Sequence, residues 1–126
     1  MKKTEETKQY SLCESEYRFA EIVWKNAPLN SGELVVLCEK SLGWKKSTTY
    51  TVLKKLCDRG IFQNDKARVT AVVLQEQVKK YQSEQFINEK FGGSLPQFIA
   101  AFMGDKKISS EEAEQLIKLI DGYKEG

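Results

Sequence analysis

The sequence predicts a mainly α-helical protein with a small β-hairpin, arranged as a winged helix-turn-helix domain followed by a C-terminal helical region. Residues 11–74 hold three apolar-patterned segments with helix-start signals, followed by a β-branched run and a turn. Residues 75–126 return to helical spacing, interrupted by a glycine pair and serine caps. We therefore expect a flexible N-terminus at 1–10, a winged-helix domain at 11–74 and a helical domain at 75–126.

Composition narrows the class of function. The chain has 126 residues, enough for one domain or a small domain with an appendage. It has no histidine, which removes the usual general base and the commonest metal ligand, and it has no glycine-rich nucleotide loop. Its three cysteines, Cys13, Cys38 and Cys57, form neither a metal-binding pair nor a disulfide framework. We expect no catalytic residues, no cofactor and no metal.

Hydropathy predicts no membrane insertion. No apolar stretch approaches the roughly 18 residues that a membrane span needs. The early lysines are not followed by an apolar secretory segment. We therefore expect a cytoplasmic protein.

The first helix is predicted over roughly 14–26. Ser11 and Glu14 have the spacing of a capping box, although Cys13, with Glu16 three residues later, competes with Ser11 as the start. Its apolar face is expected to comprise Tyr17, Ala20, Ile22, Val23 and Trp24.

A second helix is predicted over roughly 32–41. Pro28 separates it from the first helix, and Ser31 is expected to cap it. The inward residues are expected to be Leu34, Val35, Leu37 and Cys38. The chain then turns near Trp44.

The third helix, 46–59, ends at Gly60 and carries most of the functional signal. Its start is ambiguous, because either Lys45 or Ser47 is the non-helical residue that precedes the first turn. One side holds an apolar stripe of Val52, Leu53, Leu56 and Cys57. The opposite side holds hydroxyls and positive charge, namely Ser47, Thr48, Tyr50, Thr51, Lys54 and Lys55.

A two-stranded hairpin with a basic tip follows the third helix. Residues 61–63 and 68–74 are the expected strands, and 64–67 the expected turn. Residues 45–68 hold seven basic and two acidic side chains, although the whole chain has a net charge of only +2. Such a local basic patch attracts polyanions.

We interpret the third helix as a recognition helix for double-stranded operator DNA, because in this fold that helix enters the major groove and the wing lies along the backbone. Short hydroxyls near a helix start reach base edges, while lysines hold phosphates. The expected base contacts are Ser47, Thr48, Tyr50 and Thr51. The expected phosphate contacts are Lys46, Lys54, Lys55, Lys66 and Arg68.

Two alternatives stay open. A winged helix that binds protein would keep the fold but would lack the basic stretch, and an enzyme would need a catalytic constellation that the sequence does not offer. Most aromatic side chains are expected in the core. Tyr50 lies off the apolar stripe and is expected either to face DNA or to pack against the wing.

Three helices are predicted after the hairpin: 75–91, ended by Gly92 and Gly93; 95–103; and one that starts after Ser109 and ends at Gly122. Their apolar faces either complete one larger globule or pair with a second copy of the chain, and we favour the homodimer. The expected dimerisation residues are Val78, Tyr81, Phe86, Phe91, Phe98, Ile99, Phe102, Leu116, Ile117 and Ile120.

These residues resemble the BlaI/MecI family of penicillinase repressors over about 11–121. The matching features are Leu12-x-x-x-Glu16, Trp24, Trp44, S-T-T-Y-T-V-L-K-K-L, Arg59-Gly60 and the later F-I-N-E-K-F-G-G-S-L. The resemblance implies a homodimeric bacterial repressor that binds a palindromic operator and controls β-lactam resistance or related genes.

The resemblance also implies release from DNA by a membrane-bound sensor protease that cuts the repressor in its C-terminal part. The matching bond is Ala101–Phe102, where the best-known members have Asn in place of Ala101. Tyr50 stands where some members have Arg. Copper-responsive relatives carry a C-terminal cysteine cluster, which residues 58–126 lack.

Overall fold

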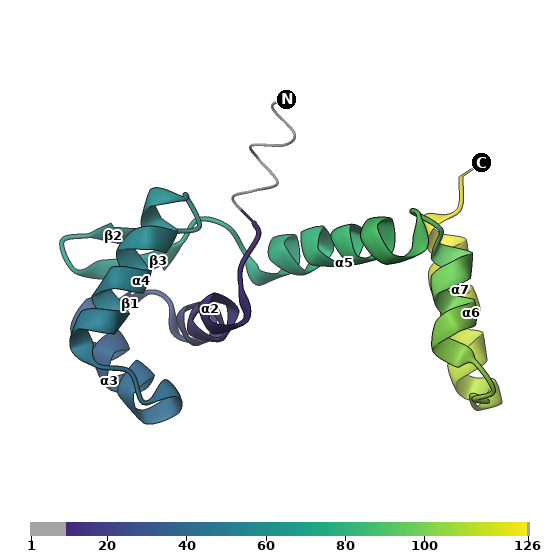
Figure 1. Cartoon of the computed structure of the whole chain (residues 1–126), viewed down its shortest axis with the longest axis horizontal. Helices are drawn as coiled ribbons and strands as arrows, with labels where there is room; N and C mark the ends of the chain where they lie inside the picture. The colour runs from purple at the N-terminus through teal and green to yellow at the C-terminus, as the bar shows by residue number, and fades with distance from the viewer. Residues whose placement is uncertain (1–9, 126) are drawn as a thin grey trace. The chain divides into compact units, whose positions relative to one another are not determined.

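The computed structural model describes residues 10–125 and contains six helices and three short strands in that range (Figure 1). The first compact unit ends at Phe86 and the second begins at Ile87. The expected flexible N-terminus lies outside the described residues, apart from Tyr10. The elements are α2 (Glu14–Asn26), β1 (Leu29–Asn30), α3 (Ser31–Leu42), α4 (Lys46–Asp58), β2 (Phe62–Asp65), β3 (Arg68–Ala71), α5 (Gln75–Phe91), α6 (Leu95–Met103) and α7 (Ser110–Tyr123).

Helix α2 begins after Cys13, which corrects the alternative start at Ser11. The backbone N–H of Cys13 donates to Oε1 of Glu16 at 3.0 Å, so the third residue of the helix satisfies a group at its own start. The helix ends at Asn26, two residues before Pro28, as predicted.

The cap of α3 is Asn30, and the prediction of Ser31 was wrong by one residue. The side-chain oxygen of Asn30 accepts from the N–H of Gly32 at 2.7 Å. Ser31 is instead the first helical residue and is buried. At the far end Gly43 has a positive φ of 70°, a conformation that costs glycine little.

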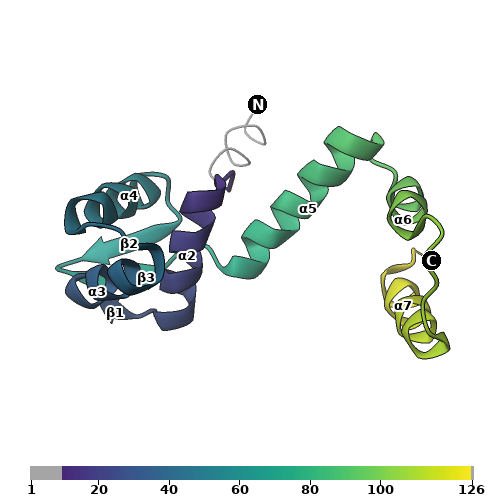
Figure 2. The same ribbon diagram turned by 60° about the horizontal axis from the view of Figure 1, so that its bottom comes forward.

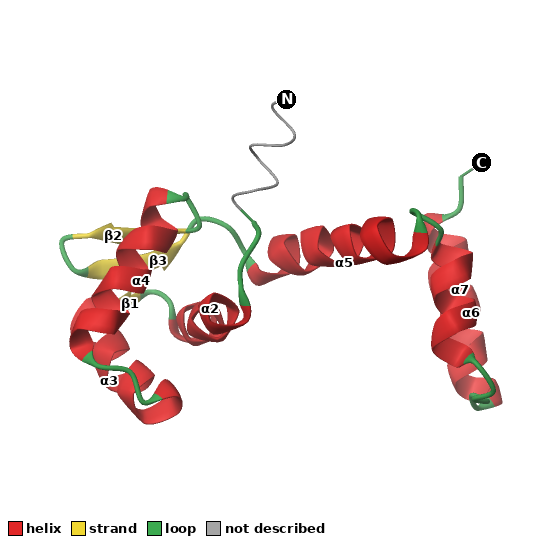
Figure 3. Cartoon of the chain, viewed as in Figure 1, coloured by secondary structure: helices red, strands yellow, loops and turns green. Residues whose placement is uncertain are grey.

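The sheet has three antiparallel strands in the order β1-β3-β2, shown in yellow in Figure 3. The predicted hairpin is present, but the third strand, β1, was not predicted. It is only two residues long, and it pairs Leu29 with Val69 and Asn30 with Arg68. A segment of this length shows no periodicity that a sequence can reveal.

The hairpin turn is tighter than predicted. Asn64 and Asp65, expected in the turn, belong to β2, so that only Lys66 and Ala67 link the strands. Both have positive φ, 51° and 69°. Positive φ at both positions is typical of the two-residue hairpin turn whose twist matches that of the flanking strands. Strand β3 ends at Ala71, three residues before the predicted end.

The core of the first unit lies between the three strands and α2, α3 and α4, which Figures 1 and 2 show grouped around the sheet. Trp44 stacks on Phe19 with ring centroids 5.7 Å apart. The indole N–H of Trp24 donates to the carbonyl of Val73 at 2.9 Å, which satisfies its one polar atom. The buried apolar residues are Phe19, Ala20, Val23, Leu29, Leu34, Cys38, Leu53, Leu56, Ile61, Phe62, Val69, Val73 and Val78.

The helices after the hairpin start where the sequence predicts. The hydroxyl of Ser94 accepts from the N–H of Gln97 at the start of α6, and the hydroxyl of Ser109 accepts from Glu112 at the start of α7. Gly122 does not end α7, which continues to Tyr123. Helices α6 and α7 contain no buried residue among those described.

Candidate nucleic-acid interface

Helix α4 has one face in the core and one face in solvent. Thr49, Leu53 and Leu56 are buried. Thr49 was missed as an inward residue because it is polar, although its spacing from Leu53 and Leu56 is helical. Its hydroxyl donates to the carbonyl of Lys45 at 3.2 Å, which satisfies it inside the core. This buried face fixes which residues of α4 point outward.

The start of α4 carries the short hydroxyl groups. Of the two expected boundaries, Lys45 is the cap, so Ser47 and Thr48 lie in the first turn. Both are exposed, as is Thr51 one turn later. The hydroxyl of Thr51 donates to the carbonyl of Ser47 at 2.9 Å, which leaves its oxygen able to accept from a base edge.

Tyr50 is placed differently from the other expected base contacts. Its side chain is half-buried and packs against the core. Its hydroxyl lies 3.3 Å from the hydroxyl of Ser31, the first residue of α3. Its polar atom therefore already has a partner within the protein.

The lysines of α4 are exposed but not equivalent. Lys46 lies in the first turn, beside the hydroxyl residues. Nζ of Lys54 lies 3.0 Å from Oδ2 of Asp58, with the lysine side chain 78% exposed. Nζ of Lys55 lies 3.5 Å from Oε2 of Glu16 on α2. Ion pairs as exposed as that of Lys54 are weak, so a phosphate can compete with Asp58.

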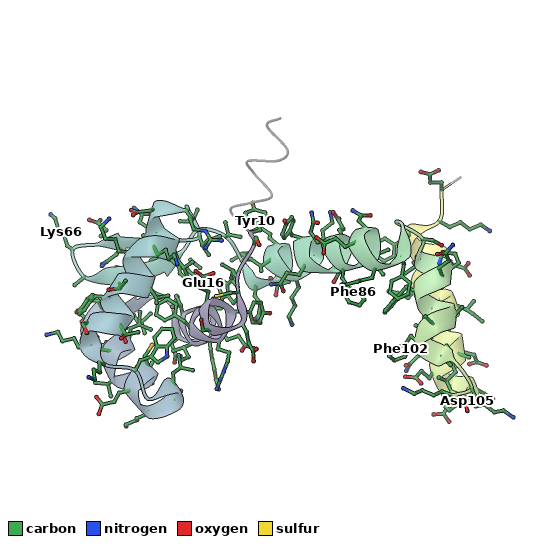
Figure 4. The ribbon with its side chains drawn as sticks, viewed as in Figure 1. Tyr10, Glu16, Lys66, Phe86, Phe102 and Asp105 are labelled. Carbon is green, nitrogen blue, oxygen red and sulfur yellow. The ribbon has the colours of Figure 1, made fainter. Side chains whose placement is uncertain are left out.

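The wing carries the other two expected phosphate contacts. Lys66 occupies the turn between β2 and β3 and projects from its end, as labelled in Figure 4. Arg68 begins β3, and both side chains are exposed. The backbone N–H of Ser31 donates to the carbonyl of Ala67 at 2.8 Å, so the wing turn is tied to the start of α3.

Glu16, which the sequence predicts only as part of a helix cap, joins α4 to α2. The carboxylate of Glu16 accepts from Arg59, the residue after α4, at 3.3 Å, and Arg59 also donates to the carbonyl of Ser11. Burial raises the pKa of Glu16, but hydrogen bonds from Cys13 and the charge of Arg59 outweigh it, so that the pKa lies below its ordinary value. No local pattern predicts this pair, because its members lie 43 positions apart.

Two of the three cysteines are shielded from solvent. Cys38 is buried and Cys57 half-buried, and burial raises the pKa of both thiols, which disfavours the reactive thiolate. Residues 10–125 hold no group of three or more Cys, Asp or Glu side chains placed to bind a metal ion. In the same range no helix has the length and apolar character to cross a membrane.

The expected dimerisation residues differ in exposure. Val78 is fully buried in the core of its own chain, so it offers no surface to a second copy. Tyr81 contacts Tyr10 edge to face at 6.1 Å. Phe98 lies between Phe91 and Phe102, with ring centroids at 5.4 and 6.0 Å. The remaining residues are large, apolar and 39–58% exposed, namely Phe86, Ile99, Phe102, Leu116, Ile117 and Ile120.

A winged helix with an exposed hydroxyl-bearing helix and a basic wing defines a DNA-binding protein of the winged helix-turn-helix class. The penicillinase repressor family model matches residues 12–122. The chain therefore belongs to the penicillinase repressor family, whose members are transcriptional repressors and not enzymes.

Individual relatives match over most of this chain but have diverged in sequence. The chain is 23% identical to a penicillinase repressor of Bacillus licheniformis, over 90% of this chain and 91% of that protein. It is 20% identical to the methicillin resistance regulatory protein MecI of Staphylococcus aureus, over 92% of this chain and 98% of the other. It is also 24% identical to an uncharacterized 16.5 kDa protein in the ptsI 3′ region of Latilactobacillus sakei, over 86% of this chain and 77% of that protein.

Proposed function

We propose that this protein is a cytoplasmic repressor that binds a palindromic operator as a homodimer and controls β-lactam resistance or related genes. Family membership supports the repressor class, and the names of the relatives from Bacillus licheniformis and Staphylococcus aureus support the choice of genes. The observation that carries the proposal is the outward face of α4, where exposed hydroxyls and lysines lie opposite a fully packed face.

Within the proposal, α4 lies in the major groove. Ser47, Thr48 and Thr51 read base edges from the first two turns, and the ring edge of Tyr50 lies next to them. Lys46, Lys54 and Lys55 hold phosphates beside the groove. Lys66 and Arg68 hold the backbone that the wing follows. Lys55 must exchange its contact with Glu16 for a phosphate to do so.

The homodimer is proposed to form through the exposed apolar side chains of α6 and α7. Ile117 and Ile120 are 58% and 57% exposed in a single copy. Large apolar side chains gain about 1.5–3 kcal/mol each when they leave water. Two copies of this surface, packed on each other, would hold two recognition helices at a fixed spacing on paired half-sites.

Release from DNA is proposed to follow cleavage of Ala101–Phe102 by a membrane-bound sensor protease. The bond lies near the end of α6, and both residues are exposed. Phe102, labelled in Figure 4, contacts Phe98 and also the ammonium of Lys106, which lies 5.0 Å from its ring centroid. The bond is helical, so α6 must open locally before a protease can bind it in extended form.

Footprinting of the full-length protein on DNA upstream of its own gene tests the proposal. We expect two protected half-sites with two-fold symmetry, with centres about one helical turn apart or a multiple of it. Protection without symmetry would contradict the dimeric arrangement. Equal affinity for this DNA and for random duplex would contradict sequence-specific repression.

A repressor of the same fold with an unrelated inducer is the second candidate, and Ala101 favours it, since the best-known members have Asn there. Co-expression with the sensor protease of a β-lactam-responsive operon separates the two. Cleavage at Ala101–Phe102 on exposure to β-lactam supports the first candidate, and an intact chain supports the second. A chain that bound a protein partner but no DNA would favour an interaction module instead.

A further inference from the structure

Ser31 lies where three parts of the winged domain meet. It is the first residue of α3, and only 5% of its surface is exposed. Its backbone N–H donates to the carbonyl of Ala67 in the wing turn at 2.8 Å. Its hydroxyl lies 3.3 Å from the hydroxyl of Tyr50 on α4. One buried residue therefore contacts both the expected recognition helix and the tip of the wing.

We propose that Tyr50 is a positioning residue for DNA binding, which acts through Ser31 to fix the wing turn relative to α4. We call the pair of hydroxyls and the Ser31–Ala67 hydrogen bond the strut. The inference rests on the proposed function, since it requires α4 and the wing to contact one duplex. It goes beyond the proposed function, because the hydroxyl of Tyr50 then holds parts of the protein in position and does not bind a DNA base.

The strut matters because the two contacts with DNA must be made together. Lys66 and Arg68 flank Ala67, so the hydrogen bond to the Ala67 carbonyl restrains the backbone from which both cations project. The wing is also held by the pairing of β1 with β3, where Leu29 faces Val69 and Asn30 faces Arg68. Without the strut the wing can still fold. However, its cations contact the DNA backbone less often while α4 lies in the major groove.

The side chains of Tyr50 and Ser31 are suited to hold α4 and the start of α3 at a fixed distance. Tyr50 has a rigid ring, half-buried against the core, so its hydroxyl has few positions to occupy. Ser31 is too buried to exchange its partner freely for water. Loss of either hydroxyl leaves the other without that partner, which costs free energy in a buried setting.

Double-mutant cycles on the full-length protein test this inference by fluorescence anisotropy with the footprinted operator. Tyr50→Phe should weaken binding by about 3- to 10-fold, the range expected for one hydrogen bond. The same loss should appear in a Lys54→Ala background, because Lys54 contacts DNA from α4 itself. In a Lys66→Ala background the loss should be smaller, because one of the two wing contacts that the strut supports is already gone.

Changes at Ser31 separate positioning from direct reading of bases. Ser31→Ala should reproduce the loss caused by Tyr50→Phe, and Ser31→Thr, which keeps the hydroxyl, should retain most of the affinity. A loss confined to one base pair for Tyr50→Phe, with no effect of Ser31→Ala, would show that Tyr50 reads DNA directly and would overturn the strut. If the affinity loss caused by Tyr50→Phe added equally to the losses caused by Lys54→Ala and by Lys66→Ala, the strut would be overturned as well.

Two controls keep the result interpretable. Thermal unfolding of each variant establishes that it is folded at the temperature of the binding assay, and if Ser31→Ala is unstable, the cycles with Tyr50→Phe alone decide. Wild-type protein that binds operator and random duplex equally would refute the proposed function and the strut together. Specific binding that is indifferent to Tyr50→Phe would refute the strut alone.

Discussion

Glu16 couples the start of the winged domain to α4, the proposed recognition helix. It is 8% exposed and accepts from the backbone of Cys13, while Arg59 and Lys55 approach its two oxygens. A buried carboxylate is tolerated only when it is paired and hydrogen-bonded. The end of α4 is therefore held to α2 by charge as well as by apolar packing.

Replacing Glu16 with Gln should lower stability. The amide oxygen can still accept from the N–H of Cys13, but the charge that faces Arg59 is lost. We expect the free energy of unfolding to fall by about 1–3 kcal/mol near neutral pH, measured by urea denaturation. Glu14→Gln is the matched control, since Glu14 is exposed in the same helical turn and its change should cost only a few tenths of a kcal/mol.

The same carboxylate should make stability depend on acidity. The pKa of Glu16 is held below its ordinary value of 4.5 by Cys13 and Arg59 against the effect of burial. Above pH 4.5 the contribution is complete; below it the unfolded chain takes up the proton first, and the contribution disappears as the pH falls through the folded pKa. The stability difference between wild type and Glu16→Gln should therefore shrink in acid. A difference that stayed constant well below the ordinary pKa would contradict this assignment.

The wing turn carries strain that a single substitution should relieve. Lys66 and Ala67 both have positive φ, and a two-residue turn of this kind favours Asn-Gly. Ala67→Gly should raise the free energy of unfolding by about 0.5–1 kcal/mol, because glycine adopts this backbone conformation without a Cβ clash. Ala71→Gly, in the ordinary strand backbone of β3, should instead lower stability. Thermal melts of the two variants compare them, and a lower melting temperature for Ala67→Gly would argue against strain in the turn.

Helix α6 should control how easily the chain is cut near Phe102. The hydroxyl of Ser94 caps its start, and loss of such a cap costs about 1 kcal/mol. Ser94→Ala should therefore raise the rate of limited proteolysis at the peptide bond that follows Phe102 by about fivefold. The reason is that a protease can cut this bond only when α6 opens locally. Ser109→Ala removes the equivalent cap of α7 and should leave this rate unchanged. Equal rates in all three proteins would mean that opening of α6 does not limit cleavage.

The helices could be predicted from the sequence because their signals are local. Apolar spacing, the caps Ser94 and Ser109 and the Gly92-Gly93 pair lie within single elements, and the structure confirms the helices they predict. Strand β1 could not be predicted, because two residues become a strand only through pairing with β3. The cap of α3 was misassigned for a related reason, since Asn30 and Ser31 are both good capping residues and the contacts of Ser31 with Tyr50 and Ala67 decide between them.

The candidate site could be predicted only in part, for the same physical reason. The exposure of Ser47, Thr48 and Thr51 follows from the apolar face of one helix. The partner of Tyr50 lies 19 positions away, and that of Arg59 lies 43 positions away. Contacts over such separations arise from the tertiary fold and leave no periodic pattern in the sequence.

The exposed apolar surface of the C-terminal helices should set the oligomeric state. Ile117→Glu places a charge where the proposed dimer buries an apolar side chain from each copy, and it should raise the dimer dissociation constant by about 100-fold or more. Lys118→Ala, at the neighbouring exposed position, should leave it nearly unchanged. Sedimentation equilibrium measures both. Wild-type protein that remained monomeric at micromolar concentration would remove the basis for paired recognition helices.

The assignment of α4 as the recognition helix is tested most directly by comparing Thr51→Ala with Lys54→Ala on operator and on random duplex, over a range of salt concentrations. Thr51→Ala should cost about 1–3 kcal/mol on the operator, mainly through one base pair, and little on random DNA. Lys54→Ala should weaken binding to both and reduce the salt slope by about one. If both variants lost affinity equally on operator and random duplex, α4 would not be reading sequence in the way proposed.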